Sequence, residues 1–289
     1  MLVGGAGNGE IGEWGFSALV ETDGRKILFD TGFRPQTVLH NAAVLGIDLS
    51  DVTDVVLSHH HGDHTGGLLT LRREFARKNP AALSRVHVGR GIFWNRGLDK
   101  KGVPHNPMPK LRVAYEATGG TFIEHDGPAE IAPGVWLTGP IARPHPERNF
   151  GVAPGTRVEA PDGPREDTIP EDSALVLDTT RGLVVITGCG HAGVVNTLTA
   201  ARQLVRPASV HALIGGIHLL TSDEPALMWT AGKFREFGVA HLFAAHCTGL
   251  EATYRLRTLA GLARETAVVA AVGATFDLTR GIDALILAR

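Results

Sequence analysis

A run of histidines early in the chain constrains its fold and chemistry more than any other feature. The segment from His59 to His64 reads His-His-His-Gly-Asp-His, so an H-x-H-x-D-H spacing brings several potential metal ligands together. The run follows the apolar segment Val55 to Leu57 and precedes Gly66-Gly67. It is therefore expected at the end of a buried strand, where the chain enters a turn.

The residue types and their spacing predict metal binding. Zinc and related divalent ions are bound by imidazole and carboxylate groups. His59 and His61 can project to one side of an extended chain, while Asp63 and His64 can turn toward a second ion after the flexible Gly62. A solvated loop or a purification tag can also be rich in histidine, but a tag lies at a terminus and lacks the interleaved aspartate. The segment thus predicts a two-metal site of the kind used in hydrolysis.

Composition and charge narrow the possible partners. The 289 residues are 43% hydrophobic and 20% charged, as in a globular protein with a well-buried core. A net charge of −2 without a Lys/Arg run gives no reason to expect nucleic acid, and no apolar stretch is long enough to span a membrane. We expect a small-molecule substrate, and the sequence leaves the oligomeric state open. No secretory leader is visible, which favours the cytoplasm; a periplasmic location requires that a leader has been removed.

Apolar stretches alternate between strand-like and helix-like patterns along the chain. They predict one domain over residues 1–289, of α/β class, in which two mixed sheets pack face to face with helices outside, an αββα sandwich. Strands are expected at 15–21, 25–30, 55–57, 86–88, 121–123, 135–137, 174–177, 183–187, 210–214 and 242–245, and helices at 36–45, 68–78, 192–204, 224–237 and 250–262.

One long segment interrupts this alternation. Residues 143–171 are rich in proline, glycine and charge, so we interpret them as a loop inserted into the domain, and a loop of this length is usually functional. A lid over the site is the preferred interpretation, with an uninformative insertion as the alternative. In it, His145, Glu147 and Arg148 are candidates to approach the site from above.

Two later segments repeat the arrangement of strand, possible ligand and turn. The strand expected at 183–187 runs into Cys189-Gly190-His191, and the strand expected at 242–245 runs into His246-Cys247. Two cysteines cannot form a disulfide framework, and both lie beside a histidine. The alternative for each histidine is a hydrogen-bonded core residue, but two such elements beside the His59 to His64 run favour ligands.

These motifs together resemble the metallo-β-lactamase superfamily over nearly the whole chain. The resemblance rests on Phe29-Asp30-Thr31-Gly32 and on the run from His59 to His64. The stretches at 188–193, 215–219 and 246–249 are similar to the branch named after dihydropterin-ribofuranosylaminobenzene-phosphate synthase. The resemblance implies that one ion is held by His59, His61 and His191 and the other by Asp63, His64 and His246, with Asp30 orienting a ligand histidine from behind.

The chain departs from the superfamily pattern at one strand end. Gly188-Cys189 stands where the superfamily has Gly-Asp with a metal-bridging aspartate, and Thr138-Gly139-Pro140 lacks the usual histidine. His191 would then replace that histidine, and Cys189 is either the bridging thiolate ligand or simply a buried residue. His218, after another Gly-Gly strand end, is a candidate substrate donor or proton relay, with a structural histidine as the alternative.

The site predicts an enzyme with two divalent ions, most simply Zn²⁺, with Mn²⁺ or Fe²⁺ as alternatives. We hypothesise that a metal-bridging hydroxide attacks an ester-type substrate such as a lactone (lactonase) or a phosphate ester (phosphoesterase), with Asp63 and His218 as catalytic residues. The alternatives are a metal-dependent synthase or transferase acting on a pterin- or phosphate-containing substrate, an iron-based oxidoreductase on the same fold, and a non-catalytic metal-binding module. Aromatic candidates for an apolar substrate pocket are Trp14, Phe93, Trp94, Trp136 and Trp229.

Overall fold

The first sheet begins with the hairpin that the Asp23-Gly24 turn predicts. Both turn residues have positive φ, 47° and 74°, which is the backbone that a tight hairpin with right-handed strand twist requires. In this computed structural model, which describes residues 9–98, 100–147, 151–153 and 155–285, three parallel strands follow the hairpin in the order β1-β2-β3-β4-β5. The strands are β1 (Ala18–Thr22), β2 (Arg25–Phe29), β3 (Asp54–Leu57), β4 (Arg85–Gly89) and β5 (Thr121–His125).

The second sheet is built from the later part of the chain. Its order is β14-β13-β12-β11-β10-β7-β6, in which the strands from β11 to β14 are parallel and the others antiparallel. The strands are β6 (Ala129–Ala132), β7 (Val135–Leu137), β10 (Ala174–Thr179), β11 (Gly182–Thr187), β12 (Val210–Gly215), β13 (His241–Ala244) and β14 (Ala267–Val269).

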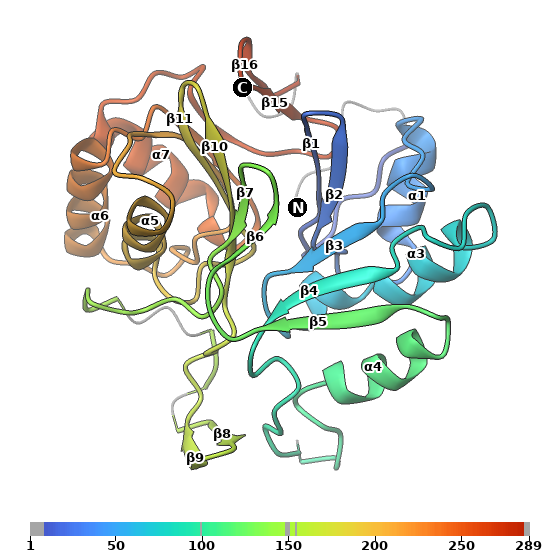
Figure 1. The fold of residues 1–289 in the computed structure, drawn as a ribbon. Coiled ribbons are helices and arrows are strands. Elements are labelled where there is room, and N and C mark those ends of the chain that lie inside the picture. The colour runs from blue at the N-terminus through green and yellow to red at the C-terminus, as the bar shows by residue number, and fades with distance from the viewer. Residues whose placement is uncertain (1–8, 99, 148–150, 154, 286–289) are drawn as a thin grey trace.

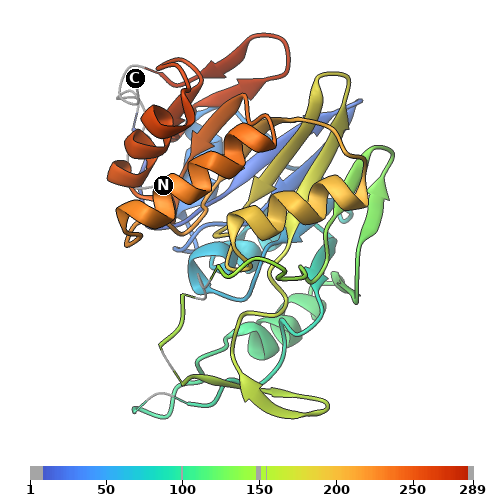
Figure 2. The same cartoon turned by 90° about the vertical axis from the view of Figure 1, so that its left-hand side faces the viewer.

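Helices cover the outer face of each sheet, so the molecule has four layers (Figure 1). Figure 2, turned by 90°, shows α5, α6 and α7 lying across the second sheet. The αββα sandwich expected from the sequence is therefore confirmed. The longer helices are α1 (Thr37–Val44), α3 (Leu68–Phe75), α4 (Met108–Glu116), α5 (Val194–Leu204), α6 (Glu224–Glu236) and α7 (Leu250–Ala260), and the shorter elements are α2 (Gly62–Thr65), β8 (Arg157–Ala160), β9 (Gly163–Glu166), the 3-10 helix η1 (His246–Thr248), β15 (Thr275–Asp277) and β16 (Gly281–Asp283).

The apolar side chains explain why these layers form. Successive residues of a strand face opposite sides of its sheet, so Val56 packs between the sheets while its neighbours Val55 and Leu57 pack under the outer helices. The second sheet does the same, since Ile186 faces inward and Val185 faces the outer helices. Each fully buried aliphatic side chain stabilises the fold by about 1.5–3 kcal/mol relative to exposure. Both faces of both sheets are thereby covered.

The strand ends position the site. Parallel neighbours end at the same edge of a sheet, so the turns after β11, β12 and β13 lie together. The turn after β3 leaves the facing sheet, and its backbone meets the second sheet where the Ser173 amide donates to the Ser58 carbonyl over 3.0 Å. Among the described residues, no helix has both the length and the apolar character needed to cross a bilayer.

Residues 143–171 differ from the expected loop because they contain a hairpin, β8–β9. Val158 and Ala160 of β8 are buried while their neighbours are exposed, and Gly163 turns the chain with a φ of 119°. An isolated bridge between Asn95 and Glu159 fastens the hairpin to the loop after β4. The hairpin projects from the sandwich near β4 and β5 (Figure 1).

Candidate metal centre

Three histidines converge at the junction of the two sheets. His59 Nε2 lies 3.0 Å from His61 Nδ1 and 3.2 Å from His191 Nε2, so the turn after β3 meets the turn after β11. Burial lowers the pKa of His59, and burial together with His60 lowers the pKa of His61 to about 3. Both imidazoles are thus neutral at physiological pH, which is the form that binds a metal ion.

A second group of three lies next to the first. His246 Nε2 is 3.1 Å from Asp63 Oδ2 and 3.3 Å from His64 Nε2. Burial alone would raise the pKa of Asp63, but its hydrogen bond to His246 and the adjacent histidines hold that pKa below its usual value. An ionised carboxylate therefore stands beside two imidazoles. In each group the candidate ligand atoms lie within 4.8 Å of one another.

Asp30 connects the two groups from behind. Its Oδ2 accepts hydrogen bonds from His64 Nδ1 over 2.7 Å and from Ser58 Oγ over 2.8 Å, and its Oδ1 accepts from the Ser58 amide. Ser58 Oγ in turn lies 2.9 Å from His59 Nδ1. The hydrogen bond to Asp30 keeps a proton on His64 Nδ1 and directs Nε2 toward the cluster. Asp30 also outweighs burial and raises the pKa of His64. The expected contact with a ligand histidine is present, and it extends through Ser58 to the other group.

Backbone geometry supports this connection. Asp30 has a φ of 55°, a left-handed conformation that is uncommon for aspartate. Gly188 is needed opposite it, because a Cβ there would lie 2.0 Å from Ser58 Oγ and 2.6 Å from Asp30 Oδ2. The Gly-rich turn after β11 thus lets the second sheet approach the carboxylate of the first.

Cys189 lies between the two groups. Its Sγ is 3.1 Å from His64 Nε2, and His59, His64 and Cys189 themselves form a group with ligand atoms within 4.8 Å. Cys247 forms another such group with Cys189 and His246, so it is a candidate ligand beyond those that the sequence predicts. Burial raises the pKa of the Cys189 thiol. The position fits a bridging ligand, but only a bound cation would favour the thiolate in these surroundings.

His218 stands beside the first group rather than within it. Its ring centroid is 4.8 Å from that of His191, and burial lowers its pKa to about 4. Within the described part of the chain, its buried Nδ1 has no hydrogen-bond partner. The side chain is therefore neutral at pH 7 and has a free polar atom near the candidate ligands.

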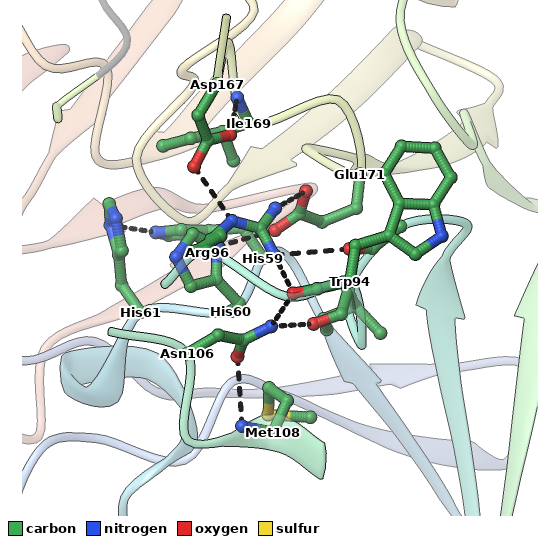
Figure 3. A network of polar contacts seen from close by, with 12 residues as sticks. His59, His60, His61, Trp94, Arg96, Asn106, Met108, Asp167, Ile169 and Glu171 are labelled. Atoms are coloured by element: carbon green, nitrogen blue, oxygen red, sulfur yellow. Dashed lines mark hydrogen bonds and ion pairs between the residues drawn. The ribbon is translucent and has the colours of Figure 1, made fainter. Parts of the chain in front are cut away.

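His60 faces away from the candidate ligands, as strand alternation predicts. Its Nδ1 lies 2.6 Å from Glu171 Oε1, and Arg96 Nη2 lies 2.6 Å from the other oxygen of that carboxylate (Figure 3). Arg96 Nε also donates to Asp167 over 2.8 Å. Burial alone would raise the pKa of Glu171, but His60 and Arg96 lower it to about 2. This buried charge network, which the sequence did not reveal, fixes the back of the cluster.

The segment after Arg143 contacts α5 and His191. His145 Nε2 lies 3.2 Å from Thr199 Oγ1, so that ring packs on the helix instead of approaching the candidate ligands. The Glu147 carboxylate accepts hydrogen bonds from two amides in the first turn of α5. A Cβ on Gly151 would lie 2.4 Å from His191 Cε1, so Gly151 itself packs closely against that ring. Arg148, the third candidate, lies outside the described residues.

Two curated proteins are similar to this chain in sequence. A synthase from Methanocaldococcus jannaschii, named 7,8-dihydropterin-6-methyl-4-(beta-D-ribofuranosyl)-aminobenzene-5'-phosphate synthase, is 27% identical over 252 residues, which cover 82% of each chain. The anti-Pycsar protein of Saccharibacillus brassicae is 42% identical over 104 residues, which are 35% of this chain and 40% of that protein.

A crystal structure described as a metal-dependent hydrolase of the beta-lactamase superfamily matches with a TM-score of 0.68 and 30% identity, over 89% of this chain and 90% of that one. The sequence pattern of the metallo-beta-lactamase superfamily matches residues 15–204, which is more than half of the chain. Because the family match covers more than half of the chain and the similar structure covers most of it, the chain belongs to the metallo-β-lactamase superfamily.

Proposed function

We propose that this protein is a metal-dependent synthase whose histidine cluster binds two divalent ions, most simply zinc, and acts on a pterin- or phosphate-containing substrate. One observation carries the metal site, namely the spacing of the candidate ligand atoms. A tetrahedral zinc ion with bonds of about 2.0–2.1 Å spaces its ligands roughly 3.3 Å apart. The nitrogen and oxygen atoms of the two groups lie 3.0–3.3 Å from their nearest partners.

The donor chemistry also fits. Buried imidazoles and an ionised carboxylate are suitable ligands, and the assignment is His59, His61 and His191 for one ion and Asp63, His64 and His246 for the other. Cys189 is proposed as the ligand shared between them. Divalent ions held there would supply Lewis acidity and lower the pKa of a bound water molecule.

Two side chains at the edge of the cluster can transfer a proton and orient the substrate. Asp63 is 18% exposed, so its carboxylate is partly open to solvent and can accept a proton from a reacting group. His218, neutral at pH 7, can accept a hydrogen bond from the substrate next to His191. We propose Asp63 as the proton acceptor and His218 as the residue that orients the substrate.

The synthase assignment is supported by the archaeal synthase, whose similarity extends over most of both chains. A hydrolase of ester-type substrates is the second candidate. It is supported by the similarity to the metal-dependent hydrolase structure and by the position of Asp63. Both candidates use the same side chains, so the substrate distinguishes them.

A substrate comparison tests both. Zinc-loaded protein would be incubated with a dihydropterin that carries a leaving group on its 6-methyl carbon together with ribofuranosylaminobenzene 5'-phosphate, and separately with lactones and phosphate esters. Coupling of the first pair supports the synthase, and ester cleavage without coupling supports the hydrolase. Metal quantification and an ultraviolet-visible spectrum on the same samples would reveal iron, as an oxidoreductase requires.

Variants test the site itself. His61→Ala and Asp63→Ala should lose both metal content and turnover, whereas His211→Ala, a histidine of β12 that contacts His241 and Phe276 instead of the cluster, should keep both. Unchanged turnover in metal-free protein would refute the proposal.

A further inference from the structure

We propose that Trp14 binds a flat aromatic ring of the substrate beside Asp63, His64 and His246. This inference rests on the proposed function, because it places the reacting group of the same substrate at the metal cluster. It adds a residue that selects the substrate by contact with an aromatic ring, while the phosphate or other acidic group is taken from the proposed function.

The position of Trp14 is the first support. Its ring centroid lies 4.9 Å from that of His246, at an interplanar angle of 57°, and the side chain is 40% exposed. Part of a large aromatic surface is thus open to solvent directly beside a candidate ligand. Binding sites for small molecules commonly place aromatic walls beside a few polar groups.

The segment that carries Trp14 is fastened to the fold on both sides. Before it, Ile11 exchanges two hydrogen bonds with the Asn41 side chain, over 2.8 and 2.9 Å. After it, the Phe16 amide donates to the Asp63 carbonyl over 3.2 Å. The backbone that carries the ring is thus fixed relative to Asp63, and a pre-ordered aromatic wall loses little entropy on binding.

Phe33 is a second exposed aromatic residue near the candidate ligands, and Glu13 holds its backbone in place. The Glu13 carboxylate accepts hydrogen bonds from the Phe33 amide over 2.7 Å and the Arg34 amide over 3.0 Å. Phe33 is 50% exposed, and its ring lies 3.9 Å from the position that a Cβ on Gly62 would occupy. Two exposed rings therefore flank the turn that carries Asp63 and His64.

The other aromatic candidates from the sequence already have partners within the protein. Trp94 is covered by the Arg165 guanidinium, 5.0 Å from its ring, and Phe93 packs against Phe122. Trp136 packs against the core of the second sheet. Trp229, on α6, is 36% exposed, but its ring contacts His145 rather than the ligand groups. Trp229 is therefore a matched control for an exposed tryptophan away from the site.

Direct binding tests the inference without turnover. Isothermal titration of the zinc-loaded protein would compare methylphosphonate, cyclohexylphosphonate and phenylphosphonate. We expect phenylphosphonate to bind roughly five- to tenfold more tightly than the other two, as a stacked aromatic pair would give. Trp14→Ala should remove this advantage while zinc content and methylphosphonate affinity stay unchanged. Trp14→Phe should keep most of it, and Trp229→Ala should keep all of it.

The possible failures are distinguishable. If methylphosphonate binds but phenylphosphonate binds no more tightly, or if Trp14→Ala keeps the preference, the ring-binding role is wrong and the metal site stands. Equal affinity for the cyclohexyl and phenyl compounds would mean that the site favours any apolar group of this size and does not recognise aromatic rings. This result would also overturn the inference. If none of the three binds the zinc-loaded protein, the proposed function falls and the inference with it.

Discussion

At the scale of single residues, the cluster depends on groups that hold the ligands without touching a metal ion. Ser58 is the clearest case, because its hydroxyl joins Asp30 to His59 and so links one ligand group to the carboxylate that orients the other. Ser58→Ala should weaken metal binding about 10- to 100-fold, as loss of such a supporting hydrogen bond generally does. Competition with a chromogenic zinc chelator would measure this change.

The control for Ser58 is Ser173→Ala. Ser173 is equally buried, but its hydroxyl makes only a long contact, 3.4 Å, to a backbone carbonyl. If both variants lose zinc equally, the effect comes from general loss of a buried hydroxyl and not from the orientation of His59.

Cys189 gives a second prediction at this scale. If its thiolate is shared between two ions, Cys189→Ala should bind fewer than two zinc ions per chain. A cobalt-substituted sample of this variant should lose the sulfur-to-metal absorption band. Cys247→Ala, next to it in space, should retain the band. Full zinc content and an unchanged spectrum in Cys189→Ala would mean that Cys189 is only a buried thiol.

How far the site was predictable also depends on the residue. The run from His59 to His64 can be recognised from the sequence as a metal-binding motif because its candidate ligands are close together in the chain. His191 and His246 can be recognised because each follows a strand and precedes a turn, as that run does. Ser58 and Glu171 carried no such signal, since their roles depend on side chains more than 20 residues away, Asp30 and His60. Only the three-dimensional fold brings these partners together.

At the scale of elements, helix α5 supports the turn that carries His191. A helix start leaves amide groups without intrahelical partners, and here Glu147, from outside the helix, accepts hydrogen bonds from the Val195 and Asn196 amides over 3.1 and 2.8 Å. Glu147→Ala should lower the free energy of unfolding by about 1 kcal/mol, as the loss of a helix cap does, measured by urea denaturation.

The comparison variant is Glu74→Ala on α3. Glu74 forms an exposed pair with Arg77, which should contribute less than about 0.5 kcal/mol. An effect of Glu147→Ala no larger than that of Glu74→Ala would contradict the capping role.

The elements themselves were predicted unevenly. Strand-like apolar segments on either side of Asp23-Gly24 predict the β1–β2 hairpin, and helical spacing of apolar residues predicts α5, α6 and α7. The sequence interpretation missed α4 and the β8–β9 hairpin. In β9 the residues Pro164, Arg165 and Glu166 are exposed, so no apolar alternation marks the strand. Its pairing is visible only in the backbone hydrogen bonds to β8.

At the scale of the whole molecule, buried carboxylates set how stability depends on pH. Glu171 has a folded pKa of about 2 against an ordinary value of 4.5, so it stabilises the fold above pH 4.5 and this contribution is lost as the pH falls toward 2. The contribution is on the order of 3 kcal/mol. Asp172 has a pKa raised by burial to about 7, so its contribution is present below its ordinary value of 3.8 and is lost as the pH rises to 7.

Because the two pKa values are shifted in opposite directions, replacing the two carboxylates should change the pH dependence of stability in opposite ways. In metal-free protein, Glu171→Gln should lower stability more at pH 6 than at pH 4, whereas Asp172→Asn should improve stability at pH 7 relative to pH 4. Urea unfolding at these pH values would measure both. Parallel pH profiles for the two variants would show that the environments of these neighbouring carboxylates do not differ as the structure indicates.

The candidate ligand cluster also joins the two halves of the molecule. His59, His61, Asp63 and His64 follow β3 in the first sheet, while His191 and His246 follow β11 and β13 in the second. An ion bound by both sets would cross-link the sheets in the folded state only. At a free zinc concentration 100 times the dissociation constant, each ion stabilises the fold by about 2.7 kcal/mol. This corresponds to roughly 5–10 °C in melting temperature for a chain near this size.

Removal of metal by a chelator should therefore lower the melting temperature of the native protein by at least that amount. It should also speed hydrogen exchange in α2 and η1. The melting temperature of His61→Ala should depend less on zinc. Equal melting of the native protein in zinc and in chelator would show that no ion connects the sheets.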